Sequence, residues 1–512
     1  MDSYLFLVIA LLVIAVGDLV VGVSNDAVNF LNSAIGSRVA SRRTILIIAA
    51  LGIFVGAVFS SGMMEVARKG IFTPSYFSFA EVMAIFSAVM ITDILLLDTF
   101  NSLGMPTSTT VSIVFELLGA TVMVGALMYS EATQPAYAFT DLINLNKASL
   151  IIAGIFLSVG IAFTVGALAQ WLARLWFTFD LKRSQGRFGP LFAGLSLAII
   201  FFFIAVKGLK GANLGPSVDA FLSEHMLLLT GLIFLVGTFL LWVLQKKRNV
   251  NPLRMVVFAG TFSLALAFAG NDLVNFIGVP LAGLQSYQLW EASGMAADAY
   301  SMEKLAAAVQ TPKYLLFIAG GIMVVTLWFS AKARKVTDTE VKLGAQGAVS
   351  ERFKPNALSR GIVQAANGFN NFFTTVVPNP TLDKLNARLR TPNLTEQDRP
   401  AFDLVRASVN LVIASILIAF ASSLKLPLST TYVSFMVAMG TSLSDRAWGA
   451  ESAPYRVAGV LNVIGGWFLT ALGAFTACAL VALLIYYGGN YVALGLFAVA
   501  LGFLIYSNRR QR

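Results

Sequence analysis

The chain has 512 residues, of which 57% are hydrophobic and only 12% are charged. Soluble globular proteins carry about 25% charged residues, so this chain cannot cover itself with polar side chains and needs lipid around much of its surface. The net charge of +10 does not indicate a nucleic-acid partner, because the basic residues lie in short stretches between apolar runs, as in cytoplasmic loops. The single His225 excludes a multi-histidine metal site, and the single Cys478 excludes an intrachain disulfide.

Apolar runs recur along the chain. A membrane-spanning helix needs about 20 mostly apolar residues. Runs of roughly this kind lie at 3–23, 43–63, 80–103, 109–130, 149–175, 190–206, 224–245, 253–270, 313–331, 404–424, 430–443, 457–487 and 489–507. They predict an all-α polytopic membrane protein with about 12–13 membrane segments. The breaks at Met105–Pro106 and at Pro427 are too short to reach bulk water, so the paired segments at 80–130 and 404–443 could be two re-entrant hairpins.

One long stretch, residues 332–400, is polar and charged, and it predicts a soluble cytoplasmic loop. Basic residues also gather after the first, fifth, seventh and last apolar runs. They are Arg38, Arg42 and Arg43; Lys182, Arg183 and Arg187; Lys246, Lys247 and Arg248; and Arg509, Arg510 and Arg512. If the segments alternate, all these places lie on one side, which the positive-inside rule makes cytoplasmic. We therefore expect a multi-pass protein of the cell (plasma or inner) membrane, with its N-terminus outside and its C-terminus in the cytoplasm.

Two motifs each occur twice, in the same order. Residues 25–30 read NDAVNF and residues 271–276 read NDLVNF, while PTSTT at 106–110 is matched by PLSTT at 427–431. The first motif precedes the second by 82 residues in the first half and by 157 in the second half, measured from Asp to Ser. The excess of 75 residues is close to the 69 residues of the 332–400 stretch. This indicates a duplicated chain with a loop inserted in its second copy.

Seven apolar segments precede residue 253, so the second copy is expected to enter the membrane from the opposite side. Inverted repeats of this kind are typical of secondary transporters, whose substrate lies between the repeats near the bilayer midplane. The expected division is a first repeat at 1–187, two linking segments at 188–250, and the first part of the second repeat at 251–331. The loop at 332–400 then precedes the rest of the second repeat at 401–487 and a final segment with a basic tail at 488–512.

The Asn-Asp motifs carry carboxylates inside apolar runs. An ionised carboxylate in hydrocarbon costs several kcal/mol, so such a residue usually faces a cavity and a partner. Asn29 and Asn275 lie one helical turn after Asp26 and Asp272, and their oxygens are hard ligands suited to Na⁺. The alternative is that each Asn-Asp pair caps a helix at the membrane edge, which is harder to reconcile with two equivalent copies.

Each Ser-Thr-Thr element follows a proline and opens an apolar helical run: Ser108, Thr109 and Thr110, and Ser429, Thr430 and Thr431. Serine and threonine are good N-caps, so capping alone is one interpretation. However, a helix N-terminus also offers free N–H donors and partial positive charge to an anion. Two such termini that meet would form an anion site without a buried arginine, and phosphate or sulfate suits that geometry.

Paired Asn-Asp-x-x-Asn motifs, each followed by Pro-x-Ser-Thr-Thr, resemble the signatures of the inorganic phosphate transporter (PiT) family. The resemblance implies inverted repeats and uptake of inorganic phosphate with Na⁺ or H⁺, while some bacterial relatives carry sulfate. It implies that Ser108, Thr109, Thr110, Ser429, Thr430, Thr431, Asn25 and Asn271 bind substrate. It further implies that Asp26, Asn29, Asp272 and Asn275 bind the cation, with Na⁺ suspected at Asp26 and Asp272.

The sequence therefore predicts a phosphate symporter that needs no cofactor and that has lipid, phosphate and Na⁺ or H⁺ as its partners. A sulfate or other oxyanion transporter is the alternative within this class, and a homodimer is left open. A membrane-embedded phosphatase would need a histidine or a clustered acid–base set, so we expect no enzyme. The pattern G-x-x-x-x-G-K-[ST] does not occur, so we do not expect ATP to drive transport.

Overall fold

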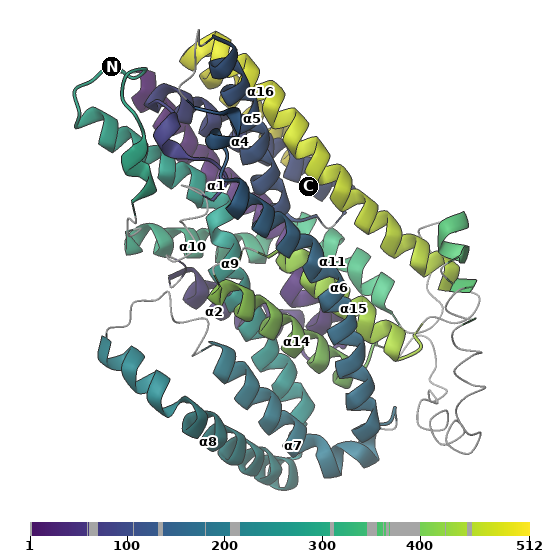
Figure 1. Ribbon diagram of the computed structural model, residues 1–512. Coiled ribbons are helices and arrows are strands. Elements are labelled where there is room, and N and C mark those ends of the chain that lie inside the picture. The colour runs from purple at the N-terminus through teal and green to yellow at the C-terminus, as the bar shows by residue number, and fades with distance from the viewer. Residues whose placement is uncertain are drawn as a thin grey trace.

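The computed structural model shows a bundle of α-helices, many of them long and tilted against one another (Figure 1). It describes residues 3–511 apart from 59, 61–69, 106, 132–136, 180, 205–215, 308–311, 346–355, 362, 365–367, 369–399, 425, 427 and 448–452. Within this part, nine helices are long and apolar enough to cross a membrane, or ten if the bent pair α10 and α11 forms one span. The expected all-α polytopic membrane protein is confirmed.

The helices follow the predicted apolar runs closely. Their bounds are α1 Ser3–Gly36, α2 Arg42–Val58, α4 Phe79–Leu103, α5 Thr109–Glu131, α6 Leu145–Trp176, α7 Leu181–Phe202, α8 Pro216–Arg248, α9 Pro252–Glu291, α10 Lys313–Phe329, α11 Ala331–Gly344, α14 Leu404–Ser423, α15 Thr430–Ser444 and α16 Ala453–Gln511. The predicted runs at 457–487 and 489–507 are joined in α16, which is interrupted at Gly489, where φ is +66°. The expected boundary at 487/488 thus lies next to this interruption, whereas the boundary at 187/188 falls inside α7.

The two Asn-Asp motifs do not end their helices, although the predicted apolar runs at 3–23 and 253–270 stop just before them. α1 continues ten residues beyond Asp26, and α9 continues nineteen residues beyond Asp272. At 1.5 Å per residue, α1 with its 34 residues is about 51 Å long and α9 with its 40 residues is about 60 Å long. Both are longer than a hydrocarbon core of about 30 Å. The polar motifs therefore lie inside continuous helices, where side-chain hydrogen bonds compensate their burial.

α1 and α9 cross each other in antiparallel directions. The ring of Phe276 lies against Gly22, where any Cβ would clash with it, and Leu11 lies against Gly283. The rings of Phe30 and Phe268 are 5.3 Å apart between centroids. Residue numbers rise along α1 while the numbers of the contacting residues fall along α9, as an antiparallel crossing requires. The crossing brings the two Asn-Asp motifs together.

The helices α5 and α15, which follow the two Ser-Thr-Thr elements, pack against helices of the opposite half of the chain. α5 packs on α16, with Gly119 against the carbonyl of Phe475, while α15 packs on α6, with Gly440 against the carbonyl of Phe163. Gly119 and Gly440 occupy the same place after their Ser-Thr-Thr elements. Because no side chain larger than hydrogen fits at either contact, close packing of the helices requires glycine at both positions.

The first part of the expected soluble loop at 332–400 is a helix packed against the bundle. Residues Ala331–Gly344 form α11, which is bent by 69° from α10 and packs along α1. Its charged residues Lys332 and Glu340 are buried, and they contact Asp98 and Asn32. These charges suggested a solvated segment, but each has a buried partner. Most of the remaining loop lies outside the described residues.

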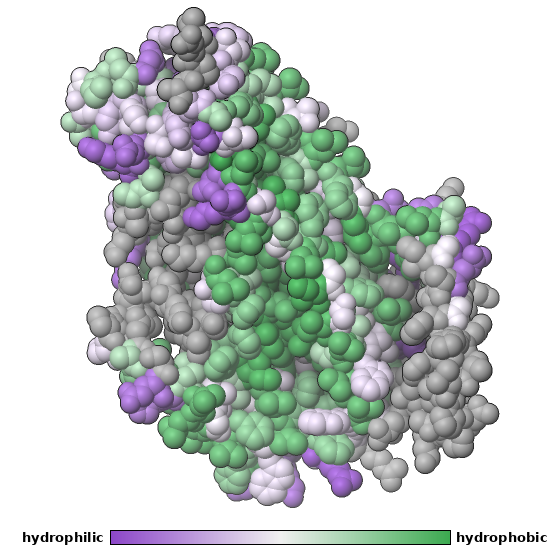
Figure 2. Space-filling view, in the orientation of Figure 1, coloured by the Kyte–Doolittle hydropathy of each residue, from purple (hydrophilic) through white to green (hydrophobic). Residues whose placement is uncertain are grey.

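The outer surface has the polarity of a membrane protein. Figure 2 shows green hydrophobic residues across the centre of one face, with purple hydrophilic residues gathered towards its edges. α7 and α8 form a pair at the edge of the bundle (Figure 1), and α8 exposes Leu227, Leu235 and Phe239. These exposed apolar side chains fit a lipid environment.

Candidate functional site

The two Ser-Thr-Thr elements meet in the interior of the bundle. Ser108 and Ser429 are each 1% exposed, and each hydroxyl oxygen accepts a hydrogen bond of 3.1 Å from the backbone N–H three residues later. The hydroxyl of Thr110 reaches the carbonyl of Leu428 at 3.4 Å, so the starts of α5 and α15 are adjacent. The serines thus cap their helices, but their O–H hydrogens remain able to donate to a ligand.

The four threonine hydroxyls of these helix starts are divided between two buried carboxylates. Asp26 accepts from Thr109 at 2.9 Å and from Thr431 at 3.1 Å. Asp272 accepts from Thr110 at 3.2 Å and from Thr430. Each carboxylate therefore binds one threonine from each half of the chain, and the two sets of contacts are equivalent under the repeat.

Asn29 and Asn275, one helical turn after the two aspartates, also bind threonines across the two halves of the chain. The Asn29 amide donates to Thr430 and Thr431, both at 3.1 Å, and the Asn275 amide donates to Thr109 and Thr110 at 3.3 and 3.0 Å. Each asparagine thus contacts the helix start of the opposite half of the chain. Amide, hydroxyl and carboxylate groups from both halves form one continuous polar site.

Asn25 and Asn271 are held by residues that the sequence analysis missed. Asn25 donates to Asn101 at 2.7 Å and accepts from the backbone of Thr107 at 3.2 Å. Asn271 accepts from Ser422 at 3.3 Å and donates to the carbonyl of Leu428 at 2.8 Å. Asn101 and Ser422 each lie five residues before the proline of their Ser-Thr-Thr element. This shared position was the available signal, but Asn and Ser are different residues, so it was easy to overlook.

The structure thus brings together all twelve residues expected at the site: Asn25, Asp26, Asn29, Ser108, Thr109, Thr110, Asn271, Asp272, Asn275, Ser429, Thr430 and Thr431. We call this set the midplane site, after the position between the repeats that the sequence predicts for it. All twelve are at most 3% exposed. The carboxylate, hydroxyl and amide oxygens of this set are hard ligands, which suit Na⁺.

The midplane site has an unbalanced charge. Both carboxylates are fully buried, and none of the ion pairs among the described residues involves Asp26 or Asp272. Two buried negative charges without a cation are unfavourable, and an anion placed beside them would make the imbalance worse. The site can therefore hold an anion only together with added positive charge.

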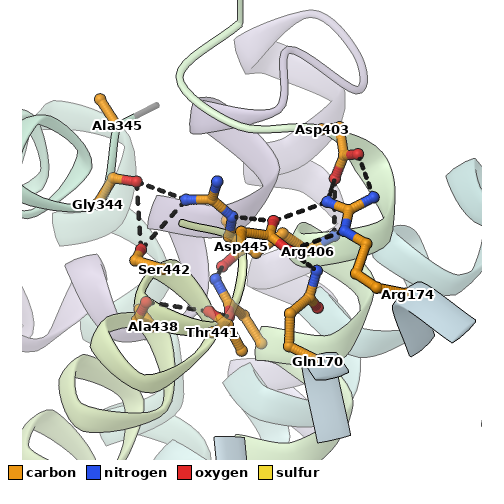
Figure 3. A network of polar contacts seen from close by, with 12 residues as sticks. Gln170, Arg174, Gly344, Ala345, Asp403, Arg406, Ala438, Thr441, Ser442 and Asp445 are labelled. Atoms are coloured by element: carbon orange, nitrogen blue, oxygen red, sulfur yellow. Dashed lines mark hydrogen bonds and ion pairs between the residues drawn. The ribbon is translucent and has the colours of Figure 1, made fainter. Parts of the chain in front are cut away.

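A second, largely buried cluster contains two aspartates that do have cationic partners (Figure 3). Arg174 on α6 binds Asp403 through two nitrogens at 2.8 and 3.0 Å, and it binds Asp445 at 2.7 Å. Arg406 on α14 donates to Asp445 at 2.9 Å and to the carbonyl of Gly344 at 2.7 Å. We call these four charged residues the arginine cluster. It joins α6 and α14 to the ends of α15 and α11.

The arginines determine the charge state of Asp445, which follows the last residue of α15. Burial raises the pKa of Asp445, but the positive charges of Arg406 and Arg174 and the hydrogen bonds of Arg174 and Gln170 outweigh it. The pKa of Asp445 therefore lies below its ordinary value.

Comparison with known proteins agrees with this fold. A family model described as the phosphate transporter family matches residues 22–339. A relative from Pyrococcus abyssi, named as a candidate phosphate permease, is 27% identical over 309 residues, which cover 58% of this chain and 68% of the relative. A similarly named relative from Pyrococcus furiosus is 24% identical over 331 residues, covering 62% of this chain and 72% of the relative.

A solved structure described as the sodium-dependent phosphate transporter has the same fold. Its TM-score is 0.63 at 18% sequence identity, and the match covers 94% of this chain and 99% of that chain. The family match covers more than half of this chain and includes both Asn-Asp motifs and the first Ser-Thr-Thr element. The expected family is thereby confirmed: the chain belongs to the phosphate transporter family.

Proposed function

We propose that this protein is a secondary active symporter that takes up inorganic phosphate together with Na⁺, or with H⁺, at the midplane site. Ser108, Thr109, Thr110 and their counterparts in the second half would bind the phosphate oxygens. Asp26 and Asp272, with the oxygens of Asn29 and Asn275, would bind the cation. Family membership supports phosphate as the substrate, and the charge of the site supports a cation as its companion.

One observation supports coupling between cation binding and phosphate binding. The hydroxyls of Thr109, Thr110, Thr430 and Thr431 all donate to Asp26 or Asp272. A hydroxyl has only one hydrogen to donate, so none of these four can donate to phosphate while it binds a carboxylate. A cation bound to the carboxylates would supply the missing positive charge and free the hydroxyls. Phosphate would then bind well only after the cation.

The architecture supports alternating access between two inverted halves. α1 and α9 carry equivalent motifs and cross in antiparallel directions, and the helix starts at Ser108 and Ser429 converge on the same point. Under the orientation expected from the basic loops, the N-terminus lies outside and the C-terminus in the cytoplasm. Movement of one half against the other would then open the midplane site to each side in turn.

Uptake of labelled phosphate into proteoliposomes tests this function. We expect uptake to follow an inward Na⁺ gradient, or an inward H⁺ gradient, and to disappear when neither gradient is present. Unlabelled sulfate in excess should leave phosphate uptake unchanged. Uptake that is independent of both gradients would contradict the symport mechanism. Stronger competition by unlabelled sulfate than by unlabelled phosphate would indicate that sulfate is the substrate.

A further inference from the structure

Three carboxyl side chains form a second buried acidic group in the first half of the chain. Asp18 lies on α1, Asp93 on α4 and Glu116 on α5, and each is 0% exposed. Asp18 precedes Asp26 by eight residues, which places it about 12 Å further along the helix. We call Asp18, Asp93 and Glu116 the carboxyl triad. None of these three residues belongs to the midplane site.

The carboxyl triad lacks the hydrogen bonds that a buried carboxylate needs. Asp18 and Asp93 are neighbours in the interior, and no oxygen of either residue has a hydrogen-bond partner among the described residues. Glu116 accepts only from Ser112, at 2.9 Å, and its other oxygen has no partner. Unsatisfied buried carboxylates are strongly unfavourable. Something outside this set of side chains must therefore compensate them.

No positive charge of the described chain does so. The other titratable groups that face the triad are Asp26, further along α1, and Cys478, on α16. The described ion pairs include none of the three carboxyls, and Lys332 nearby is bound to Asp98. Three carboxylates in this place would repel one another as well as lose hydration.

The triad belongs to one half of the chain only. The repeat places Leu264, Ala414 and Val437 at the positions equivalent to Asp18, Asp93 and Glu116. All three are buried apolar residues. The midplane site, by contrast, is duplicated residue by residue. The carboxyl triad is therefore not part of the duplicated site, and its role must be separate from that of the midplane site.

We propose that the carboxyl triad is a buried proton-binding site, in which Asp18 and Asp93 share a proton and Glu116 carries another. A proton on one carboxyl of a facing pair donates to the other, which supplies the missing hydrogen bond and removes a charge at once. A proton needs only two facing oxygens, whereas a metal ion needs a converging shell. The described residues contain no group of three or more Asp, Glu, His or Cys arranged to hold a metal. This site stands independently of the proposed transport.

Infrared spectroscopy of the purified protein tests the site without phosphate, because a protonated carboxyl and a carboxylate absorb at different frequencies. At neutral pH we expect bands of protonated carboxyl groups that shift in D₂O. Asp93→Asn and Glu116→Gln should each remove part of this absorption. The matched control is Asp98→Asn combined with Lys332→Met, which removes a buried but paired carboxylate and should leave these bands unchanged.

Asp18→Asn provides a second, independent readout, because the shared proton then loses one of its two oxygens. The pH at which the remaining Asp93 carboxyl ionises should shift relative to wild type. A thermal unfolding curve equal to that of wild type shows that the variant is folded. The proposal is overturned if the three single variants keep every protonated band, or if Na⁺ at constant pH removes those bands. Failure of phosphate uptake in proteoliposomes would leave the infrared result untouched.

Discussion

The arginine cluster and the midplane site each contain two aspartates, but the partners of these aspartates differ. In the arginine cluster, Asp403 and Asp445 are matched by two arginines within 3.0 Å. In the midplane site, Asp26 and Asp272 receive only hydroxyl and amide donors. Buried charges of the first kind are permanently paired. Under the proposed function, those of the second kind are neutralised by a cation that arrives from solution.

Under the proposed function, this difference separates the part of the molecule that holds the fold from the part that exchanges ions. The arginine cluster ties α6 and α14 to the ends of α11 and α15 (Figure 3). A protein that provides its own arginines in one place could have provided them in the other. Their absence from the midplane site is therefore consistent with a site that must release its cation in every cycle.

Removing a carboxylate of the midplane site should have the largest effect on transport. Asp26→Asn or Asp272→Asn should abolish coupled phosphate uptake, because the neutral amide no longer attracts the cation. The protein should still reach the membrane, since the amide keeps the size of the side chain. Uptake of labelled phosphate under a Na⁺ or H⁺ gradient measures this. Asp18→Asn, which lies on the same helix outside the site, should be milder, and near-normal uptake by Asp26→Asn would remove that residue from the site.

The corresponding change in the arginine cluster should instead reduce stability. Asp445→Asn removes the carboxylate that binds the buried Arg406 and Arg174, and breaking a buried ion pair in this way costs about 3–5 kcal/mol. Thermal unfolding in detergent should show the loss. Asp141→Asn, which changes an exposed aspartate, is the control. A variant as stable as wild type would show that the cluster is not a structural tie.

Substitutions at the helix starts should have a smaller effect on phosphate. Ser108→Ala or Ser429→Ala removes a donor from a desolvated anion, and a hydrogen bond to a charged group contributes about 1.5–3 kcal/mol. Phosphate affinity should fall roughly tenfold to a hundredfold, as measured by equilibrium binding. Ser78, which caps α4 at Glu81, provides the control, because Ser78→Ala should lower stability alone. If Ser108→Ala behaves like Ser78→Ala, the serines only cap their helices.

The smallest expected effect is the pH dependence of the arginine cluster. Because the folded-state pKa of Asp445 is lowered, its contribution to stability is present above the ordinary aspartate pKa of about 3.9. It is lost as the pH falls through the folded-state value. Acid unfolding of wild type should therefore include a component that Asp445→Asn lacks. Equal acid sensitivity of the two proteins would argue against an ionised Asp445 in the fold.

The sequence predicted the helices and the members of the midplane site well, because both leave a repeated pattern. The apolar runs give the helices, and the duplicated Asn-Asp and Ser-Thr-Thr motifs give the twelve residues that meet. It failed where a charge suggested solvent: α11 was taken as the start of a soluble loop because Lys332 and Glu340 are charged, although both are buried beside partners.

The sequence also could not reveal partners that are distant along the chain. Asp445 and Arg174 are separated by 271 residues, and Asp403 and Arg174 by 229 residues. No local pattern links such positions, so the arginine cluster became visible only in the structure. The length of α1 and α9 beyond their motifs was missed for a related reason. Polar residues suggested a helix end, but their hydrogen bonds to other helices allow each helix to continue.

The central claim is that a cation must bind before phosphate can use the threonine hydroxyls. Equilibrium binding of labelled phosphate to the purified protein tests it, with Na⁺ compared against a bulky organic cation at mildly alkaline pH. We expect phosphate to bind tightly with Na⁺ and weakly without it, and phosphate to raise the affinity for Na⁺ by the same factor. If H⁺ is the coupling ion, acid pH should restore binding in the absence of Na⁺. Phosphate affinity that changes with neither Na⁺ nor pH would contradict the account.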